Sequence, residues 1–215
     1  MATTNIGTIL NKVWTVVQDT SGSTGIRWPR AEMIGWLNDA QREIVLFHPQ
    51  ASVTSTLATV KQGTRQSLAD IDANGIRILD VVRNFDSTGT VPGRATRVVS
   101  REVLDAQRPD WHSEVGASVI HWIYDPRDPK TFYIYPALSN SVNPTAKLEV
   151  VYSSSPKELA ANSVDTAFIS IDDVYANTII NYMLFRAYSK DAEYAQNAQA
   201  AQAYYTLFTN ALSTK

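Results

Sequence analysis

The segment that best combines acids with an imidazole is DWHSE, which runs from Asp110 to Glu114. Two carboxylates on either side of His112 could support general acid–base catalysis of a hydrolytic reaction. The surrounding stretch, residues 108–116, is polar and aromatic and is typical of an exposed loop. A loop of this kind offers nothing nearby in sequence to orient the three groups. We therefore predict that Asp110, His112 and Glu114 are not catalytic.

Three pairs of neighbouring carboxylates could do acid–base work or hold a metal ion. Each has a simpler structural interpretation. Two pairs lie in predicted turns, where Asp bonds to nearby backbone groups, and the third lies at a predicted helix start, where negative charge is favourable. The pairs are Asp70/Asp72, Asp125/Asp128 and Asp172/Asp173.

The other motifs of enzyme chemistry are absent from the sequence. There is no cysteine, which excludes a disulfide, a thiol nucleophile and a Cys-based zinc site. No GxxxxGK[ST], GxGxxG or GxSxG pattern occurs. His48 lies at a predicted helix end, and His121 lies in an alternating strand where it should face water or a neighbouring chain. We predict no catalytic residue, no cofactor and no metal.

One basic cluster, formed by Arg94, Arg97 and Arg101, has no acid within it. It could contact phosphates or a partner's carboxylates, and the alternative is a solvated or locally paired surface. The formal net charge of the chain is -2, so the basic excess that is usual in nucleic-acid-binding proteins is missing.

Aromatic residues are frequent, with 5 Trp and 10 Tyr. Most should fill the core, but several lie near charged loops, where Trp and Tyr often anchor protein interfaces. The residues that we predict as interface candidates are Trp28, Arg94, Arg97, Arg101, Trp111, Tyr194, Tyr205 and Phe208.

Helical periodicity marks both ends of the chain. Apolar spacing predicts helices over residues 4–18 and from Pro29 to the residue before Pro49, separated by the Ser/Thr/Gly loop 19–25. Near the C-terminus, SIDD (residues 170–173) has the form of a capping box that opens a helix, apolar nearly all round at 179–188. Asp191 could cap a final helix. In that helix Tyr194, Ala198, Ala201, Tyr205, Phe208 and Leu212 form a regular seam.

The middle of the chain favours β structure. Alternating and aromatic segments predict strands near 53–60, 64–68, 76–82, 95–99, 119–124, 131–135 and 146–152, with one short helix at 101–107. The predicted fold class is α+β, a helical bundle of N- and C-terminal helices with an inserted antiparallel β subdomain. The predicted domains are 1–50 with 165–215, and 51–164. No basic start precedes an apolar run, and no run reaches about 18 apolar residues, so we expect no signal peptide and no membrane partner.

Three long stretches resemble a family of phage adaptor proteins, similar to the tail tubular protein A type of podoviruses. They are WPRAEMIGWLNDAQREIV (28–45), GIRILDVVRN with PGRATRVVSREVLDAQRPDWHSE (75–84 and 92–114), and YDPRDPKTFYIYP with YANTIINYMLFRAYSKDAEYAQN (124–136 and 175–197).

The resemblance implies a structural virion protein at the head–tail junction, assembled in the host cytoplasm. Such adaptors form a ring, usually twelve-fold, that joins the portal to the tail nozzle protein and often helps to seat tail fibres. Genomic DNA passes through the ring without specific binding. Two alternatives stay open, another neck or tail-completion protein of the virion, and a virion-associated hydrolase that uses the 110–114 loop.

Overall fold

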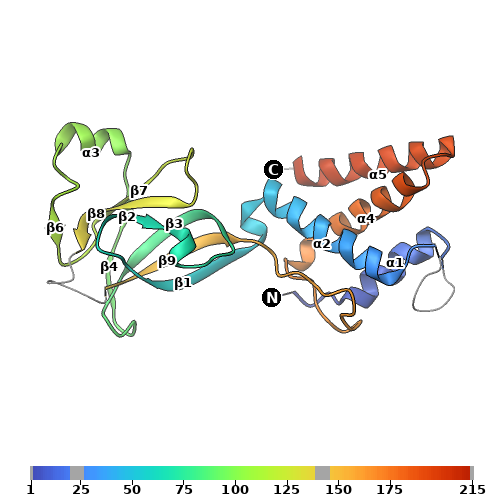
Figure 1. Cartoon of the computed structure of the whole chain (residues 1–215), viewed down its shortest axis with the longest axis horizontal. Helices are drawn as coiled ribbons and strands as arrows, with labels where there is room; N and C mark the ends of the chain where they lie inside the picture. Colours follow the sequence, from blue (N-terminus) through green and yellow to red (C-terminus); the bar gives the residue numbers. More distant parts are fainter. Residues whose placement is uncertain (1, 20–26, 139–145, 214–215) are drawn as a thin grey trace. The chain divides into compact units, whose positions relative to one another are not determined.

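The computed structural model describes residues 2–19, 27–138 and 146–213. The chain forms two compact units, one from Met1–Ser52 with Pro156–Lys215 and the other from Val53–Ser155 (Figure 1). The predicted α+β class is confirmed, with helices from both ends of the chain and β structure between them. Residues 156–164, which we had assigned to the β part, belong to the helical unit.

The helical unit contains α1 (Ile6–Val16), α2 (Arg30–Phe47), α4 (Ala176–Lys190) and α5 (Ala195–Ser213), with short 3-10 turns at Pro49–Ala51 and Asp173–Tyr175. Asn5 caps α1, because its side-chain oxygen accepts the Thr8 amide at 2.9 Å. The α2 helix starts directly after Pro29 and ends before Pro49, as proline geometry predicts.

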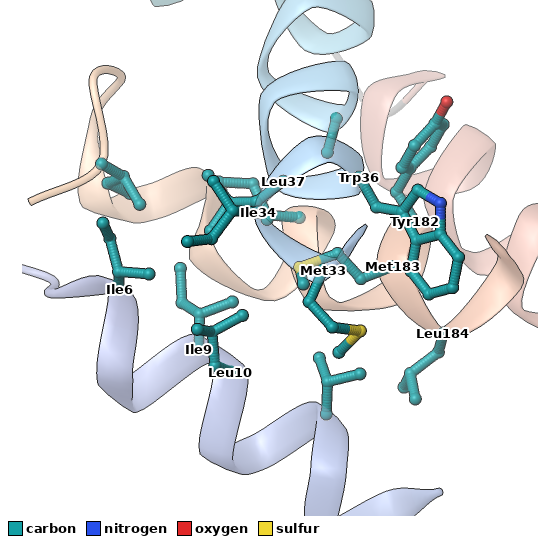
Figure 2. Packing of buried hydrophobic residues seen from close by; sticks show 14 of the residues in the cluster. Ile6, Ile9, Leu10, Met33, Ile34, Trp36, Leu37, Tyr182, Met183 and Leu184 are labelled. Carbon is teal, nitrogen blue, oxygen red and sulfur yellow. The ribbon is translucent and has the colours of Figure 1, made fainter. Parts of the chain in front are cut away.

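Residues from both ends of the chain build one hydrophobic core in this unit. Figure 2 shows Ile9 of α1, Leu37 of α2 and Met183 of α4 pointing toward one another. The α4 helix contacts α1, α2 and α5, which explains why its sequence is apolar nearly all round. Ile44 and Tyr182 are both buried in this core, so the prediction that the terminal helical pairs pack together is confirmed.

Two capping predictions are wrong. Ser170 does not cap α4, since its amide donates to Gln41 and its hydroxyl to the carbonyl of Lys157. Asp172 caps the 3-10 turn that precedes α4, and Asp173 instead accepts the amides of residues 3 and 4. Asp191 ends α4 rather than starting α5, and its carboxylate pairs with Arg27 at 2.6 Å.

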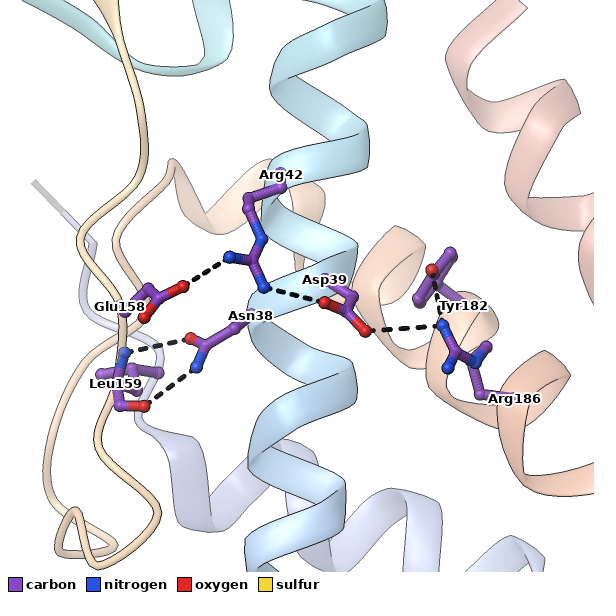
Figure 3. Close-up of polar contacts among 7 residues, drawn as sticks. All are labelled: Asn38, Asp39, Arg42, Glu158, Leu159, Tyr182 and Arg186. Carbon is purple, nitrogen blue, oxygen red and sulfur yellow. Dashed lines mark hydrogen bonds and ion pairs between the residues drawn. The ribbon is translucent and has the colours of Figure 1, made fainter. Parts of the chain in front are cut away.

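The segment after the last strand is fixed to α2 by polar contacts (Figure 3). Buried Asn38 donates to the carbonyl of Leu159 at 2.9 Å and accepts its amide at 3.0 Å. Arg42 pairs with Glu158 and with Asp39. The Asn38 side-chain amide thereby satisfies both backbone polar groups of Leu159 and fixes this segment against α2.

The β unit contains nine strands within the described residues. They are β1 (Val53–Thr59), β2 (Gly63–Ser67), β3 (Gly75–Phe85), β4 (Pro92–Ala95), β5 (Arg97–Val98), β6 (Val115–Gly116), β7 (His121–Tyr124), β8 (Thr131–Leu138) and β9 (Lys147–Ser154). A 3-10 turn covers Leu68–Asp70, and α3 spans Arg101–Gln107 as predicted. Most pairs are antiparallel, but β5 with β7 and β6 with β8 are parallel.

Two sheets share the core of the β unit. One has the order β1-β9-β3-β4, and the other has the order β2-β8-β7-β5 with β6 beside β8. Ile78 and Val150 of the first sheet pack with Phe132 and Ile134 of the second in one buried cluster. The chain passes from the first sheet to the second between β4 and β5, at Thr96. This crossing places two edge strands next to each other in sequence.

The predicted loop 19–25 lies outside the described residues apart from Asp19. The Asp19 side chain is buried and accepts the amides of Arg27 and Trp28 at 2.9 and 3.0 Å.

Candidate interaction surfaces

Two of the three polar side chains of the 110–114 loop, His112 and Glu114, are engaged elsewhere. His112 stacks on Trp111 with ring centroids 3.7 Å apart, and its Nδ1 lies 2.8 Å from the Thr64 hydroxyl. Glu114 accepts a 2.6 Å hydrogen bond from the Tyr135 hydroxyl and pairs with Arg108. These bonds lower the pKa of the Glu114 carboxyl, mainly through Tyr135, so this residue is a poor general acid. Packing and hydrogen bonding therefore account for His112 and Glu114 in this loop.

The carboxylate pairs also have structural partners. Asp70 pairs with Lys61 at 2.7 Å, Asp72 accepts the amide of Asn74, and Asp125 accepts the amide of Arg127. Asp173 accepts both amides of residues 3 and 4 and the hydroxyl of Thr3. The Thr3 hydroxyl, followed by the backbone amides, sets the pKa of this carboxyl well below its ordinary value.

No three His, Asp or Glu side chains gather as a possible metal site in the described part of the chain. None of the helices described there has the length and apolar character needed to cross a membrane.

The structure separates the predicted arginine cluster into two places. Arg94 and Arg97 line one pocket of about 320 Å³ together with Ala95, Ile120 and His121. Arg101 lines a different pocket of about 420 Å³, where its guanidinium lies 5.9 Å from the Tyr133 ring centroid. Arg101 also pairs with Asp105 at 3.3 Å within α3. Among the residues that the structure describes, Arg94 and Arg97 form no ion pair.

Three of the aromatic interface candidates are buried inside their own unit. Trp28 and Phe208 lie in the helical core, and Trp111 is completely covered in a small cluster beside β7 and β8. Each of these three side chains is packed inside its own unit and is not on the exposed surface. Aromatic type alone does not distinguish an interface residue from a core residue.

The remaining two candidates are exposed. Tyr194 precedes α5 with 67% of its surface accessible, and Tyr205 on α5 contacts Phe185 while keeping 41% accessible. Sequence reasoning missed a third exposed apolar side chain there, Leu207, which lies outside the seam.

The α5 helix has no Lys, Arg, Asp or Glu in its nineteen residues. Only Ala201, Phe208 and Leu212 are buried on it, so most of its surface is exposed yet uncharged. An exposed helix normally carries many charges, whereas the centres of protein interfaces are depleted of them. The outer face of α5 therefore has the composition of a surface that another molecule covers.

A mostly apolar groove of about 520 Å³ lies on the α1 and α4 helices of the same unit. Val16 and Ile180 form its apolar lining, and Lys12 is the charged side chain at its edge. The groove and the outer face of α5 are distinct surfaces of the helical unit. The signal that could have located α5 is the lack of charge over residues 195–213.

Open apolar and basic surfaces on two packed units are typical of a protein that works by assembly with other molecules. The model of the SU10 adaptor protein family matches residues 4–215, both units included. The chain belongs to this family of phage head–tail adaptors, which confirms the resemblance described above, and it is a structural component of the virion. No curated protein matches the chain.

Proposed function

We propose that the protein is the head-to-tail adaptor that joins the portal to the tail nozzle protein, as a ring through which genomic DNA passes. The observation that carries this proposal is the family match over residues 4–215. A twelve-fold ring, a contribution to seating tail fibres, assembly in the host cytoplasm and the absence of catalytic activity are parts of the same proposal. The net charge of -2 supports a conduit that does not hold DNA tightly.

A ring requires two different surfaces on each subunit that fit one another head to tail. The uncharged outer face of α5 and the apolar groove on α1 and α4 meet this requirement, because they are separate and similar in polarity. Leu207 provides an exposed apolar side chain on α5, and Val16 and Ile180 line the groove. In this proposal α5 of one subunit seats against the groove of the next.

We further propose that the portal drives this assembly, so that the isolated chain is mainly monomeric. Within its own unit α5 packs chiefly on α4, and alanines make up much of its sequence. Its own burial is therefore modest, and a small rearrangement on docking can complete the ring interface. A subunit that closed rings freely would compete with assembly on the capsid.

Sedimentation of the purified protein at micromolar concentration, alone and with the portal, tests the proposal. We expect monomer alone and a ring in the presence of portal. Leu207→Glu should abolish ring formation because it places a charge on the docking face. Gln202→Glu is the matched control, since it adds the same charge five positions away on another exposed face of the helix.

A ring that forms without portal would refute the portal-driven step. Normal ring formation by the Leu207→Glu protein would refute the role of α5. Failure to bind the portal at all would favour another position in the virion neck or tail.

A further inference from the structure

The pocket beside the crossing between the two sheets brings together basic groups from three strands. Arg94 lies on β4, the edge strand of one sheet, and Arg97 lies on β5, the edge strand of the other. His121 on β7 is the direct neighbour of Arg97 in the parallel pairing of β5 with β7. All three residues line the same pocket of about 320 Å³.

The buried side chain of Asn84 and the half-buried side chain of Thr96 fix the frame of this pocket. Asn84 donates to the carbonyls of Arg94 and Val119 at 2.8 Å each, and accepts the amide of Val119 at 2.8 Å. It thereby ties β4 to the segment that leads into β7. Between the arginines, the Thr96 amide donates to the carbonyl of Val82 and the Thr96 hydroxyl to that of Val81. The backbone that carries both arginines is therefore set before any ligand arrives.

The polar groups of the pocket lack partners within the described part of the chain. Neither Arg94 nor Arg97 pairs with an acid there, and Nδ1 of His121 is buried with no hydrogen-bond partner. A buried polar atom without a partner is rare in a folded protein and often marks the place of a missing ligand or water. Two guanidinium groups beside such an imidazole call for an anion with several acceptor oxygens.

We propose that this pocket binds a carboxylate side chain from an acidic segment of a partner protein in the virion. Arg94 and Arg97 supply the charge-assisted hydrogen bonds, and the His121 ring forms part of the lining beside them. Ala95 and Ile120 give the pocket apolar walls that suit the methylene stem of a glutamate. The biological setting of this inference rests on the proposed adaptor function.

Two observations favour a protein carboxylate over a DNA phosphate. The β unit as a whole is electrically balanced, with eleven Lys and Arg and eleven Asp and Glu in residues 53–155, whereas DNA-binding surfaces are strongly positive. A glutamate side chain can also enter a hollow on its own stem.

The three histidines of the chain provide a direct probe. We suggest recording the ring signals of His48, His112 and His121 by NMR while titrating a hexaglutamate peptide into the full-length protein. Inorganic phosphate and a 20-base-pair DNA duplex are titrated in parallel at the same salt concentration. We expect a saturable shift of the His121 signal with the peptide, and weaker or absent shifts for the other two histidines.

The variants Arg94→Gln and Arg97→Gln should each weaken peptide binding at least tenfold. Arg65→Gln is the matched control, because it removes the same charge from an exposed site on β2 outside the pocket. A backbone amide spectrum of each variant checks that the fold is kept.

The proposal is overturned if the peptide leaves His121 unchanged, or if Arg65→Gln weakens binding as much as the pocket variants. It is also overturned if DNA or phosphate shifts His121 and the peptide does not, which would assign the pocket to phosphate. None of these results bears on ring formation with the portal, so this inference and the adaptor function fail independently.

Discussion

Replacement of Asn84 by Ala should destabilise the β unit about as much as truncation of a buried apolar side chain. Asn84 is 7% exposed and makes three hydrogen bonds of 2.8 Å to the backbone of Arg94 and Val119. Ala removes all three and leaves two carbonyls and one amide without their partner. An unsatisfied buried polar group costs about 1–3 kcal/mol, and water that enters the vacated space offsets part of this. We expect a loss of roughly 3 kcal/mol in the free energy of unfolding.

Urea denaturation measures the change in the free energy of unfolding, and amide hydrogen exchange measures the local effect at Val119. The Val119 amide should exchange much faster in the Asn84→Ala protein than in the unmodified protein, because its acceptor is gone. Asn74→Ala is the control, since this exposed turn residue contacts Asp72 and Ser155 through its backbone hydrogen bonds. We expect its free energy of unfolding to change by no more than about 0.5 kcal/mol.

The isosteric variant Asn84→Asp provides a second test of the role of the Asn84 side chain. The Asp carboxylate can still accept the Val119 amide. The Asn84 nitrogen that donated to two carbonyls is replaced by an oxygen that cannot donate, so we expect the free energy of unfolding to fall at least as much as in Asn84→Ala. An Asn84→Ala protein with an unchanged unfolding midpoint and a protected Val119 amide would refute this reasoning. In that case Asn84 would not organise the crossing between the sheets.

Three further predictions concern other parts of the molecule. Phe208→Ala should cost about 3 kcal/mol by chemical denaturation, because Phe208 is buried against Tyr182 with ring centroids 5.1 Å apart; a loss below about 1 kcal/mol would contradict this. Hydrogen bonds from the Thr88 hydroxyl and from backbone amides lower the pKa of Asp86 to about 2, from 3.8. Its stabilisation of the turn before β4 should be complete above pH 3.8 and lost as the pH falls through 2, and exchange of the Val91 amide against pH measures this; the dependence should vanish in Asp86→Asn. A fragment of residues 1–164 should lose protection of the Ile44 amide, and a protected Ile44 would show that the N-terminal helices fold without α4 and α5.

Local sequence signals were sufficient to predict the helices. The helix over Arg101–Gln107 has its expected bounds, although the Ser100 side chain makes no cap hydrogen bond. The helix before Pro49 ends as expected, because proline disfavours helical geometry in the residue that precedes it. The predicted seam of the last helix is confirmed only in part: Ala201, Phe208 and Leu212 are buried, whereas Tyr194, Ala198 and Tyr205 are exposed.

Features that depend on distant partners could not be predicted in this way. Asp173 has the sequence position of a helix cap, but Thr3, 170 positions earlier, supplies the donors that hold it. His121 meets Arg97 only through a parallel strand pairing that leaves no local pattern. Pairings of this kind follow from the packing of the two sheets, and a single sequence carries little information about them.

Within the pocket, the arginine spacing suggested one cluster of three, but the chain turns between Arg97 and Arg101. Arg101 lies at the start of α3, where Asp105 is one helical turn away and pairs with it. The sequence therefore indicated a basic surface in this region. The turn after Arg97 leaves Arg94 and Arg97 in one pocket and places Arg101 in another.

The β unit begins and ends at neighbouring positions, since Val53 pairs with Ser153 across β1 and β9. Its entry and exit are therefore one strand spacing apart, about 5 Å. A deletion that joined Ser52 to Pro156 through a short glycine linker would close a gap of only a few residues, with little entropic penalty. The same geometry makes the β unit a single insertion, which can be removed or exchanged at one site of the helical unit.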